Sequence, residues 1–184
     1  MDIRQYIRDI PDFPKPGIMF KDITPLLASG PALRWTIDQL TERYRGSVDI
    51  VLGIESRGFI IGAALAYALG VGIAIVRKPG KLPARTISAE YELEYGRDVL
   101  QIHHDAFGHA TRVLIVDDLL ATGGTASAAI QLVESLGGEI VECAVVIELG
   151  FLRGRERLAI MRAFVHPSAV LQPSARRGRA AHPS

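Results

Sequence analysis

The chain has 184 residues, which suits one domain with a sizeable hydrophobic core. Its 21 Lys and Arg residues nearly balance its 20 Asp and Glu residues, so the net charge gives no reason to expect a nucleic-acid-binding protein. Charged residues near the amino terminus argue against a signal peptide, and we expect a cytoplasmic protein. The single cysteine, Cys143, cannot form an internal disulfide bond and lies in an apolar run, which predicts a small core residue.

Local signals predict the first elements of the chain. Apolar residues at helical spacing indicate a short amphipathic helix over residues 2–10, which Pro11 would end. Residues 11–30 combine many Pro and Gly residues with embedded apolar side chains, which is typical of an ordered loop rather than a flexible linker. Pro31 then favours a helix start, and a one-sided apolar pattern predicts a helix over residues 32–44.

Residues 59–76 carry no charged side chain and are long enough for a minimal membrane span. Gly70 and Gly72 divide this stretch, and its composition changes across the break. Alanine-rich residues 60–69 favour a helix, whereas β-branched residues 71–76 favour a strand. We therefore expect a packed helix and a buried strand, and no membrane partner.

Buried strands alternate with helices over most of the chain. This alternation implies right-handed crossovers and a parallel sheet, which places the chain in the α/β class. Residues 78–110 interrupt the pattern, and we predict a polar loop and a hairpin of strands 91–95 and 99–103 at the mouth of the sheet. The predicted sheet strands are residues 48–54, 71–76, 113–116 and 139–149, with helices over residues 58–69 and from the loop after residue 120 to residue 136.

The carboxyl-terminal region has weaker signals. Residues 153–158 suit a short helical turn, and we expect a single domain over residues 1–166. Residues 167–184 contain few large apolar side chains, so they cannot bury much surface, and we predict a disordered tail. Its three arginines fit a solvated tail better than a nucleic-acid contact.

The segment at residues 113–125 carries the strongest functional signal. Asp117 and Asp118 follow a strand that is apolar on both faces, and ligands in open α/β sheets bind beyond the carboxyl ends of the strands. The small residues 121–125 then open a helix, where free amides, glycines and the helix dipole favour a phosphate. A sugar phosphate would use both features, with its ribose hydroxyls on the carboxylates. The alternative is an ordinary strand–turn–helix unit with a solvated aspartate pair, and the loop matches neither a Walker nor a dinucleotide fingerprint.

Five motifs, in order along the chain, resemble one known family. They are FPKPGIMFKDITPLL at residues 13–27, ESRGF at 55–59, RKPGKLP at 77–83, LEYG at 93–96 and VDDLLATGGT at 116–125. The last is similar to the phosphoribosyl-pyrophosphate motif of type I phosphoribosyltransferases, and its Leu-Leu-Ala variant resembles the adenine phosphoribosyltransferase family. The resemblance spans roughly residues 3–160. It implies a Rossmann-like parallel-sheet fold of the type I phosphoribosyltransferases, with a flexible hairpin hood over the carboxyl ends of the strands.

The resemblance implies that adenine and 5-phosphoribosyl 1-pyrophosphate react to give AMP and pyrophosphate, with Mg²⁺. The two aspartates would supply anions beside a cation-like sugar, and the ion would be held mainly by substrate oxygens rather than by protein ligands. A non-proline cis peptide is implied in the turn at residues 55–57, and Arg77 would reach the neighbouring site of a homodimer. The residues implied to bind phosphoribosyl pyrophosphate are Ser56, Arg57, Arg77, Lys78, Lys81, Asp117, Asp118, Ala121, Thr122, Gly123, Gly124 and Thr125.

The same resemblance assigns the base site and the proton acceptor. Glu94 would act as general base near the purine N7, with Tyr95 of the hood shielding it from water. Glu90, Glu92 and Glu94 alternate along one predicted strand, which puts them on one face, so Glu94 is alternatively a solvent-facing strand residue. Adenine would lie between Phe20 and Leu119, with backbone groups of Met19 and Lys21 reading its edge. Catalysis is thus expected from Glu94, Arg57, Asp117 and Asp118.

Two rival functions remain at this stage. A non-catalytic regulator on the same fold should carry a helix-turn-helix or a basic face, and it should lack the hood carboxylate. The chain has neither addition and keeps Glu94. A sister enzyme that uses an oxopurine or orotate is disfavoured by residues 13–27, although base choice is a smaller step than reaction class. We expect no nucleic-acid partner.

Overall fold

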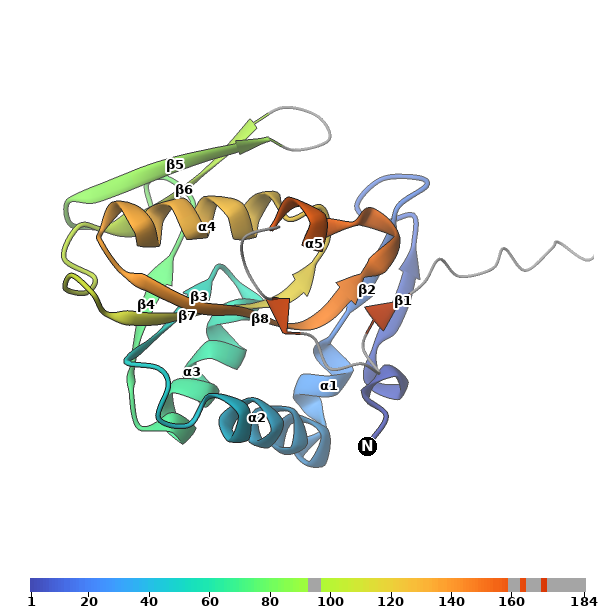
Figure 1. Cartoon of the computed structure of the whole chain (residues 1–184). Helices are drawn as coiled ribbons and strands as arrows, with labels where there is room; N and C mark the ends of the chain where they lie inside the picture. The colour runs from blue at the N-terminus through green and yellow to red at the C-terminus, as the bar shows by residue number, and fades with distance from the viewer. Residues whose placement is uncertain (93–96, 159–162, 165–169, 172–184) are drawn as a thin grey trace, which may run out of the picture.

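The computed structural model describes residues 1–92, 97–158, 163–164 and 170–171. A parallel sheet in the strand order β10-β8-β7-β3-β4 forms its centre, and β9 also pairs with β8 (Figure 1). This arrangement confirms the predicted α/β class and parallel sheet. The strands are β3 (Ile50–Ile54), β4 (Gly72–Val76), β7 (Arg112–Leu120), β8 (Glu139–Leu149), β9 (Ala163–Phe164) and β10 (Val170–Leu171).

Helices cover both faces of the sheet (Figure 1). On one face α3 (Arg57–Leu69) packs against β3 and β7, and α2 (Gly30–Tyr44) packs against α3. On the other face α4 (Gly124–Ser135) contacts β7 and β8. An antiparallel hairpin of β5 (Thr86–Glu92) and β6 (Arg97–His103) lies over α4 and forms the predicted hood.

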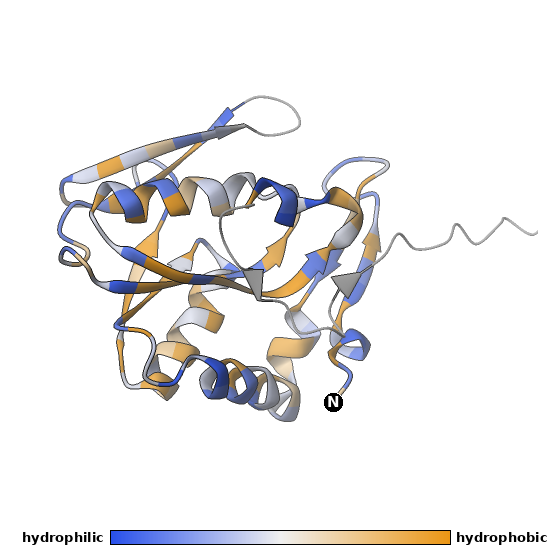
Figure 2. Ribbon diagram, viewed as in Figure 1, coloured by the Kyte–Doolittle hydropathy of each residue, from blue (hydrophilic) through white to orange (hydrophobic). Residues whose placement is uncertain are grey.

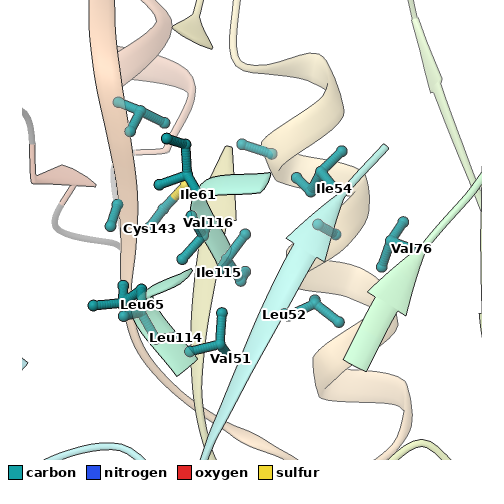
Figure 3. Packing of buried hydrophobic residues seen from close by; sticks show 14 of the residues in the cluster. Val51, Leu52, Ile54, Ile61, Leu65, Val76, Leu114, Ile115, Val116 and Cys143 are labelled. Carbon is teal, nitrogen blue, oxygen red and sulfur yellow. The ribbon is translucent and has the colours of Figure 1, made fainter. Parts of the chain in front are cut away.

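The core forms where the central strands meet these helices. Because β3 and β7 have neighbours on both faces, their side chains are buried on both sides of the sheet. Figure 2 shows hydrophobic residues along these strands and hydrophilic residues on the outer surfaces. Figure 3 shows the packing around Val51, Leu52, Ile54, Ile61, Leu65, Val76, Leu114, Ile115, Val116 and Cys143, all of which are buried.

Two sequence predictions about these elements are confirmed. The uncharged stretch 59–76 forms α3 and β4, separated at Gly70, whose φ of 72° lies in the left-handed region that glycine adopts freely. No helix among the described residues is both long and apolar enough to cross a membrane. Cys143 is a buried free cysteine, and burial raises the pKa of its thiol to about 12.

The amino terminus differs from the predicted helix over residues 2–10. A 3₁₀ helix, η1 (Ile3–Tyr6), is followed by β1 (Arg8–Pro11), which pairs antiparallel with β2 (Met19–Asp22). A helix this short is marginal on its own, whereas pairing with β2 satisfies the backbone groups of residues 8–11. The expected loop therefore contains β2 and the short helix α1 (Thr24–Ala28).

Several strand boundaries also differ from the prediction, and the largest differences lie in three places. The strand predicted to end at residue 116 continues to Leu120, because the long β8 offers partners for Asp117, Leu119 and Leu120. Asp117 and Asp118 therefore lie within β7 and not beyond it. The hood strand β5 begins at Thr86, inside the segment expected to be loop. Val170–Leu171, which we placed in a disordered tail, instead pair in parallel with β8, and the rest of that tail lies outside the described residues.

Candidate active site

A cavity of ≈ 250 Å³ opens at the carboxyl edge of the sheet. It lies between the end of β7, the loop that leads into α4, and the inner side of the hood. Its volume suits a small ligand rather than a polymer. The lining residues are Glu55, Arg57, Lys78, Tyr91, Leu100, Asp117, Asp118, Leu119, Leu120, Ala121, Thr122, Gly123, Gly124, Thr125, Ala126 and Val145.

Strand register explains why residues distant in the sequence meet at this edge. Gly53 pairs with Val116, and Ile54 pairs with Val76. Asp117 follows Val116, Glu55 follows Ile54 and Arg77 follows Val76, so these three residues lie at the same edge of the sheet. The Glu55 amide donates a hydrogen bond to the Val76 carbonyl oxygen at 3.0 Å. Parallel pairing thus brings a carboxylate from β7, a turn after β3 and a basic loop after β4 to one place.

The loop at residues 121–125 is shaped by two glycines. Gly123, with φ of 81°, occupies the left-handed region, and a Cβ there would lie 2.8 Å from the Gly154 carbonyl oxygen. A Cβ on Gly154, the first residue of α5 (Gly154–Arg157), would lie only 2.2 Å from the Ala121 carbonyl oxygen. This close contact fixes the loop at the amino terminus of α4, where free backbone amides and the helix dipole favour a phosphate.

The two aspartates of β7 have different hydrogen-bond partners. Asp118 is 5 % exposed and forms an ion pair with Arg57, whereas Asp117 accepts a hydrogen bond from the Asp118 amide at 2.8 Å. Loss of hydration and the charge of Asp118 raise the pKa of Asp117 well above its usual range. Both aspartates line the cavity, where their carboxylate oxygens can accept hydrogen bonds from hydroxyl groups of a ligand, as the expected contact with a ribose requires.

The turn at residues 55–57 has the cis peptide bond that the resemblance implies, between Glu55 and Ser56. The helix α3 starts directly after it, so close to β7 that a Cβ on Gly58 would lie 2.7 Å from the Val116 carbonyl oxygen. The absence of a side chain at Gly58 therefore allows Arg57 to reach Asp118 across the sheet edge.

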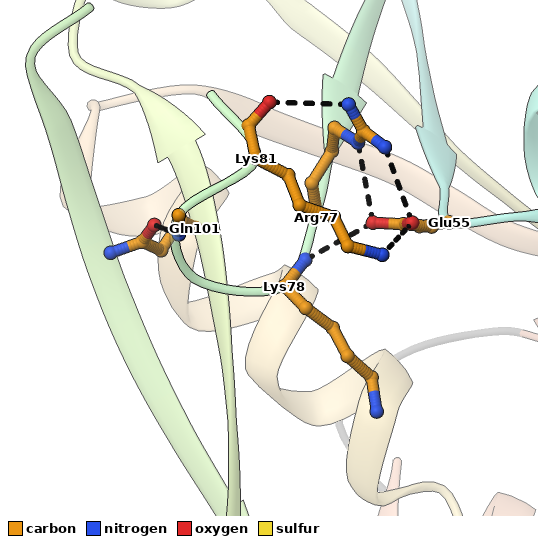
Figure 4. A network of polar contacts seen from close by, with 6 residues as sticks. Glu55, Arg77, Lys78, Lys81 and Gln101 are labelled. Atoms are coloured by element: carbon orange, nitrogen blue, oxygen red, sulfur yellow. Dashed lines mark hydrogen bonds and ion pairs between the residues drawn. The ribbon is translucent and has the colours of Figure 1, made fainter. Parts of the chain in front are cut away.

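Glu55 collects the basic groups that follow β4 (Figure 4). Its carboxylate accepts hydrogen bonds from Arg77 Nε and Nη2, both at 3.3 Å, from the Lys78 amide at 3.2 Å, and from Lys81 Nζ. Burial opposes ionisation of Glu55, but the bonds from Lys81, Arg77 and Lys78 outweigh it and lower its pKa to about 2. The sequence placed this glutamate in the turn expected to recognise pyrophosphate, but it indicated no partner for the Glu55 side chain.

The hood contributes two residues that sequence reasoning also missed. Tyr91 lines the cavity and donates a hydrogen bond to Asp98 Oδ2 at 3.2 Å, while Asp98 forms a 2.7 Å ion pair with Lys78 Nζ. Tyr91 and Asp98 face each other across the hairpin, so the correct register would have revealed the pair. Backbone bonds between Arg77 and Gln101 attach the hood to the end of β4.

The predicted base-site residues are only partly assembled. Leu119 lines the cavity, and the ring centroid of Phe20 lies 5.4 Å from the guanidinium carbon of Arg57. Met19 is 37 % exposed, and Lys21 is buried with its ammonium 2.6 Å from Asp9 Oδ1. Met19, Phe20 and Lys21 are not among the residues that line the cavity.

The remaining predicted site residues divide into three groups. Arg57, Lys78, both aspartates and the phosphate loop line the cavity as expected. Arg77 and Lys81 reach it through Glu55, and Ser56 forms the cis peptide beside it. Glu94 and Tyr95 lie outside the described residues. Among the residues that the structure describes, no group of three or more His, Cys, Asp or Glu side chains could hold a metal ion.

Comparison with known proteins identifies the family. The phosphoribosyl transferase domain model matches residues 21–162. An adenine phosphoribosyltransferase from Syntrophotalea carbinolica is 58 % identical over 164 residues, which cover 89 % of this chain and 96 % of the relative. The chain belongs to the adenine phosphoribosyltransferase family.

Solved structures of this family share the fold. The adenine phosphoribosyltransferase of Thermoanaerobacter pseudethanolicus has a TM-score of 0.87 and 51 % identity, covering 92 % of this chain and 97 % of that one. The Saccharomyces cerevisiae enzyme, solved in complex with an imino-altritol bisphosphate and adenine, has a TM-score of 0.83 and 41 % identity, covering 89 % and 95 %. These matches confirm the fold class and the resemblance drawn from the motifs.

Proposed function

We propose that this cavity carries out the family's reaction, in which the 5-phosphoribosyl group of phosphoribosyl pyrophosphate passes to adenine and gives AMP and pyrophosphate. The enzyme is accordingly a transferase of purine salvage. One observation carries the assignment of the site: strand register gathers a phosphate loop, an aspartate pair and a cluster of basic groups around one cavity of ≈ 250 Å³. Cytoplasmic action is part of the proposal and is supported by the single, buried, unpaired thiol.

The phosphate loop and the aspartates suit the sugar phosphate. Amides of residues 121–125, with the hydroxyls of Thr122 and Thr125, would bind the 5-phosphate. Asp117 and Asp118 would hold the ribose hydroxyls and place negative charge beside the C1 carbon, where positive charge develops as pyrophosphate leaves. Stabilising that charge in the transition state is what accelerates the transfer.

Mg²⁺ fits this donor set. It is a hard cation that retains waters and binds through substrate phosphates with one or two carboxylates. The ion would be held mainly by the pyrophosphate and hydroxyl oxygens of the substrate, and the aspartates would act on it through the ribose hydroxyls. When bound, the ion neutralises charge on the leaving group. Arg57, Lys78 and Lys81, with the amide of Ser56, would bind the pyrophosphate of their own cavity, and Arg77 would bind the pyrophosphate of the neighbouring subunit.

Adenine would stack between Phe20 and Leu119, with its edge read by backbone groups of Met19 and Lys21. A backbone carbonyl that accepts a hydrogen bond from the 6-amino group of adenine would face an oxygen and lose that bond when a 6-oxopurine binds. Discrimination between adenine and 6-oxopurines should therefore be large. Adenine is therefore expected to turn over at least about 10⁴-fold more efficiently than hypoxanthine or guanine. Spectrophotometric assays of the three bases with phosphoribosyl pyrophosphate and Mg²⁺ measure this. Turnover of an oxopurine would overturn the base site, and binding of the sugar phosphate without any turnover would favour the regulator.

Glu94 would act as the general base that accepts the purine proton, with Tyr95 shielding it from water. Replacing Glu94 with Gln should lower kcat by about 10²-fold or more, because an amide cannot accept the proton. Affinity for phosphoribosyl pyrophosphate should stay close to that of the wild type. Steady-state kinetics and equilibrium binding separate the two effects. The control is Glu90→Gln, an exposed side chain on β5. An unchanged kcat in Glu94→Gln would remove the base role.

A homodimer completes the proposal, with Arg77 reaching the neighbouring site. The edge of the sheet supports this assembly, because three apolar side chains are exposed on α3 and on the edge strand β4: Ile60 (49 %), Tyr67 (90 %) and Ile73 (38 %). Exposed apolar groups on neighbouring elements are typical of a protein interface. Arg77 directly follows β4, so it lies next to this surface.

A further inference from the structure

The cations of this site are neutralised by the protein's own carboxylates. Arg57 and Lys78, the basic side chains among the described lining residues, pair with Asp118 and Asp98. Glu55, whose side chain is 13 % exposed, holds Arg77 and Lys81. The basic groups assigned to pyrophosphate are thus already paired with carboxylates of the protein.

The geometry around Glu55 resembles that of a bound anion. Nε and Nη2 of Arg77 each donate to one carboxylate oxygen of Glu55 at 3.3 Å, and the Lys78 amide and the Lys81 ammonium add further bonds (Figure 4). Arginine forks bind carboxylate and phosphate in the same bidentate manner. A phosphate oxygen that approached these donors would therefore use positions that Glu55 now fills.

We propose that Glu55 is a positioning residue that competes with pyrophosphate for Arg77 and Lys81. The inference rests on the assignment of these cations to pyrophosphate. Glu55 holds the cluster in place when the site is empty and gives up these bonds when the more highly charged ligand binds. Since some of the binding energy is used to displace Glu55, pyrophosphate binds less tightly than the cluster alone would bind it, and the product leaves faster.

A purely organising role predicts the opposite effect. If Glu55 only oriented Arg77 and Lys81, its removal would leave them disordered and would weaken pyrophosphate binding. If Glu55 competes, its removal strengthens binding. The direction of the change therefore separates competition from organisation.

The test is Glu55→Gln, which keeps the shape and removes the charge. Calorimetric titration with magnesium pyrophosphate should show a Kd about tenfold lower than that of the wild type, because two cations lose their internal partner. Steady-state kinetics should show lower KM for phosphoribosyl pyrophosphate together with lower kcat, as expected when product release is slowed. Glu42→Gln removes the same charge from an exposed site on α2 and should change neither value. An unchanged or higher Kd in Glu55→Gln overturns the competition.

Two further variants keep the outcomes distinct. Lys81→Met should weaken pyrophosphate binding, and an unchanged Kd there would remove these cations from the pyrophosphate site. Weaker binding in Lys81→Met without tighter binding in Glu55→Gln would reject the competition alone. Glu55→Asp retains the charge on a shorter side chain. If Glu55→Gln fails to fold, Glu55→Asp should still bind pyrophosphate more tightly than the wild type, and no gain there would reject the proposal.

Discussion

Replacing Gly154 with alanine is expected to lower kcat/KM for phosphoribosyl pyrophosphate about 100-fold, the usual consequence of moving a binding group by about 1 Å. The added Cβ would lie 2.2 Å from the Ala121 carbonyl oxygen, which is backbone and cannot rotate away. The phosphate loop or α5 must therefore shift. The ion pair between Arg155 and the buried Glu148, at 2.7 Å, holds α5 against β8, so the loop should move more than the helix.

Steady-state kinetics with varied phosphoribosyl pyrophosphate measure this effect, and thermal unfolding shows the accompanying loss of stability. Overpacking of this kind typically costs about 1–3 kcal/mol. The matched control is Gly30→Ala at the start of α2, where the added Cβ meets no atom within 4 Å. A kcat/KM for Gly154→Ala equal to that of Gly30→Ala would show that the loop does not depend on this contact.

The central sheet was predictable because its signal is local. Runs of apolar residues in β3, β7 and β8 fit strands covered on both faces, and the predicted β8 matches the observed Glu139–Leu149. The loop before α4 was predictable for the same reason, since small residues directly follow an apolar strand. Resemblance then supplied the residue roles and the cis peptide, which no periodicity contains.

The features that were not predicted depend on partners distant in the sequence. The segment at residues 8–11 becomes a strand only because β2 lies beside it. Asp117 and Asp118 remain in β7 because β8 is long enough to pair with Asp117 and with Leu119 and Leu120 beyond it. Glu55 contacts Arg77 and Lys81 only when β3 and β4 pair in register, so the residues next to Glu55 in the sequence did not indicate these ion pairs. Pairing of distant segments, not local propensity, decided each of these cases.

Arg57→Lys is expected to lower kcat/KM for both substrates by about 10²–10³-fold, the loss typical of removing one aligned donor from an electrostatic site. In the structure Arg57 Nε donates to Asp118 Oδ2 while the guanidinium carbon lies 5.4 Å from the Phe20 ring centroid. One planar group thus touches both the aspartate assigned to the ribose and the ring assigned to adenine. A lysine ammonium keeps the charge but has neither the fork nor a flat face to stack on the ring.

The kinetic pattern tests this double contact more sharply than the size of the loss. If Arg57 served only the sugar phosphate, KM would rise for phosphoribosyl pyrophosphate alone, whereas contact with Phe20 predicts that the KM for adenine rises as well. Arg34→Lys, on the exposed side of α2, makes the same substitution away from the site and should leave kinetics unchanged. Wild-type kcat/KM in Arg57→Lys would show that charge alone suffices. Because Asp118 is buried and keeps a cationic partner in this variant, a large loss of activity with little loss of stability would locate the effect in donor geometry.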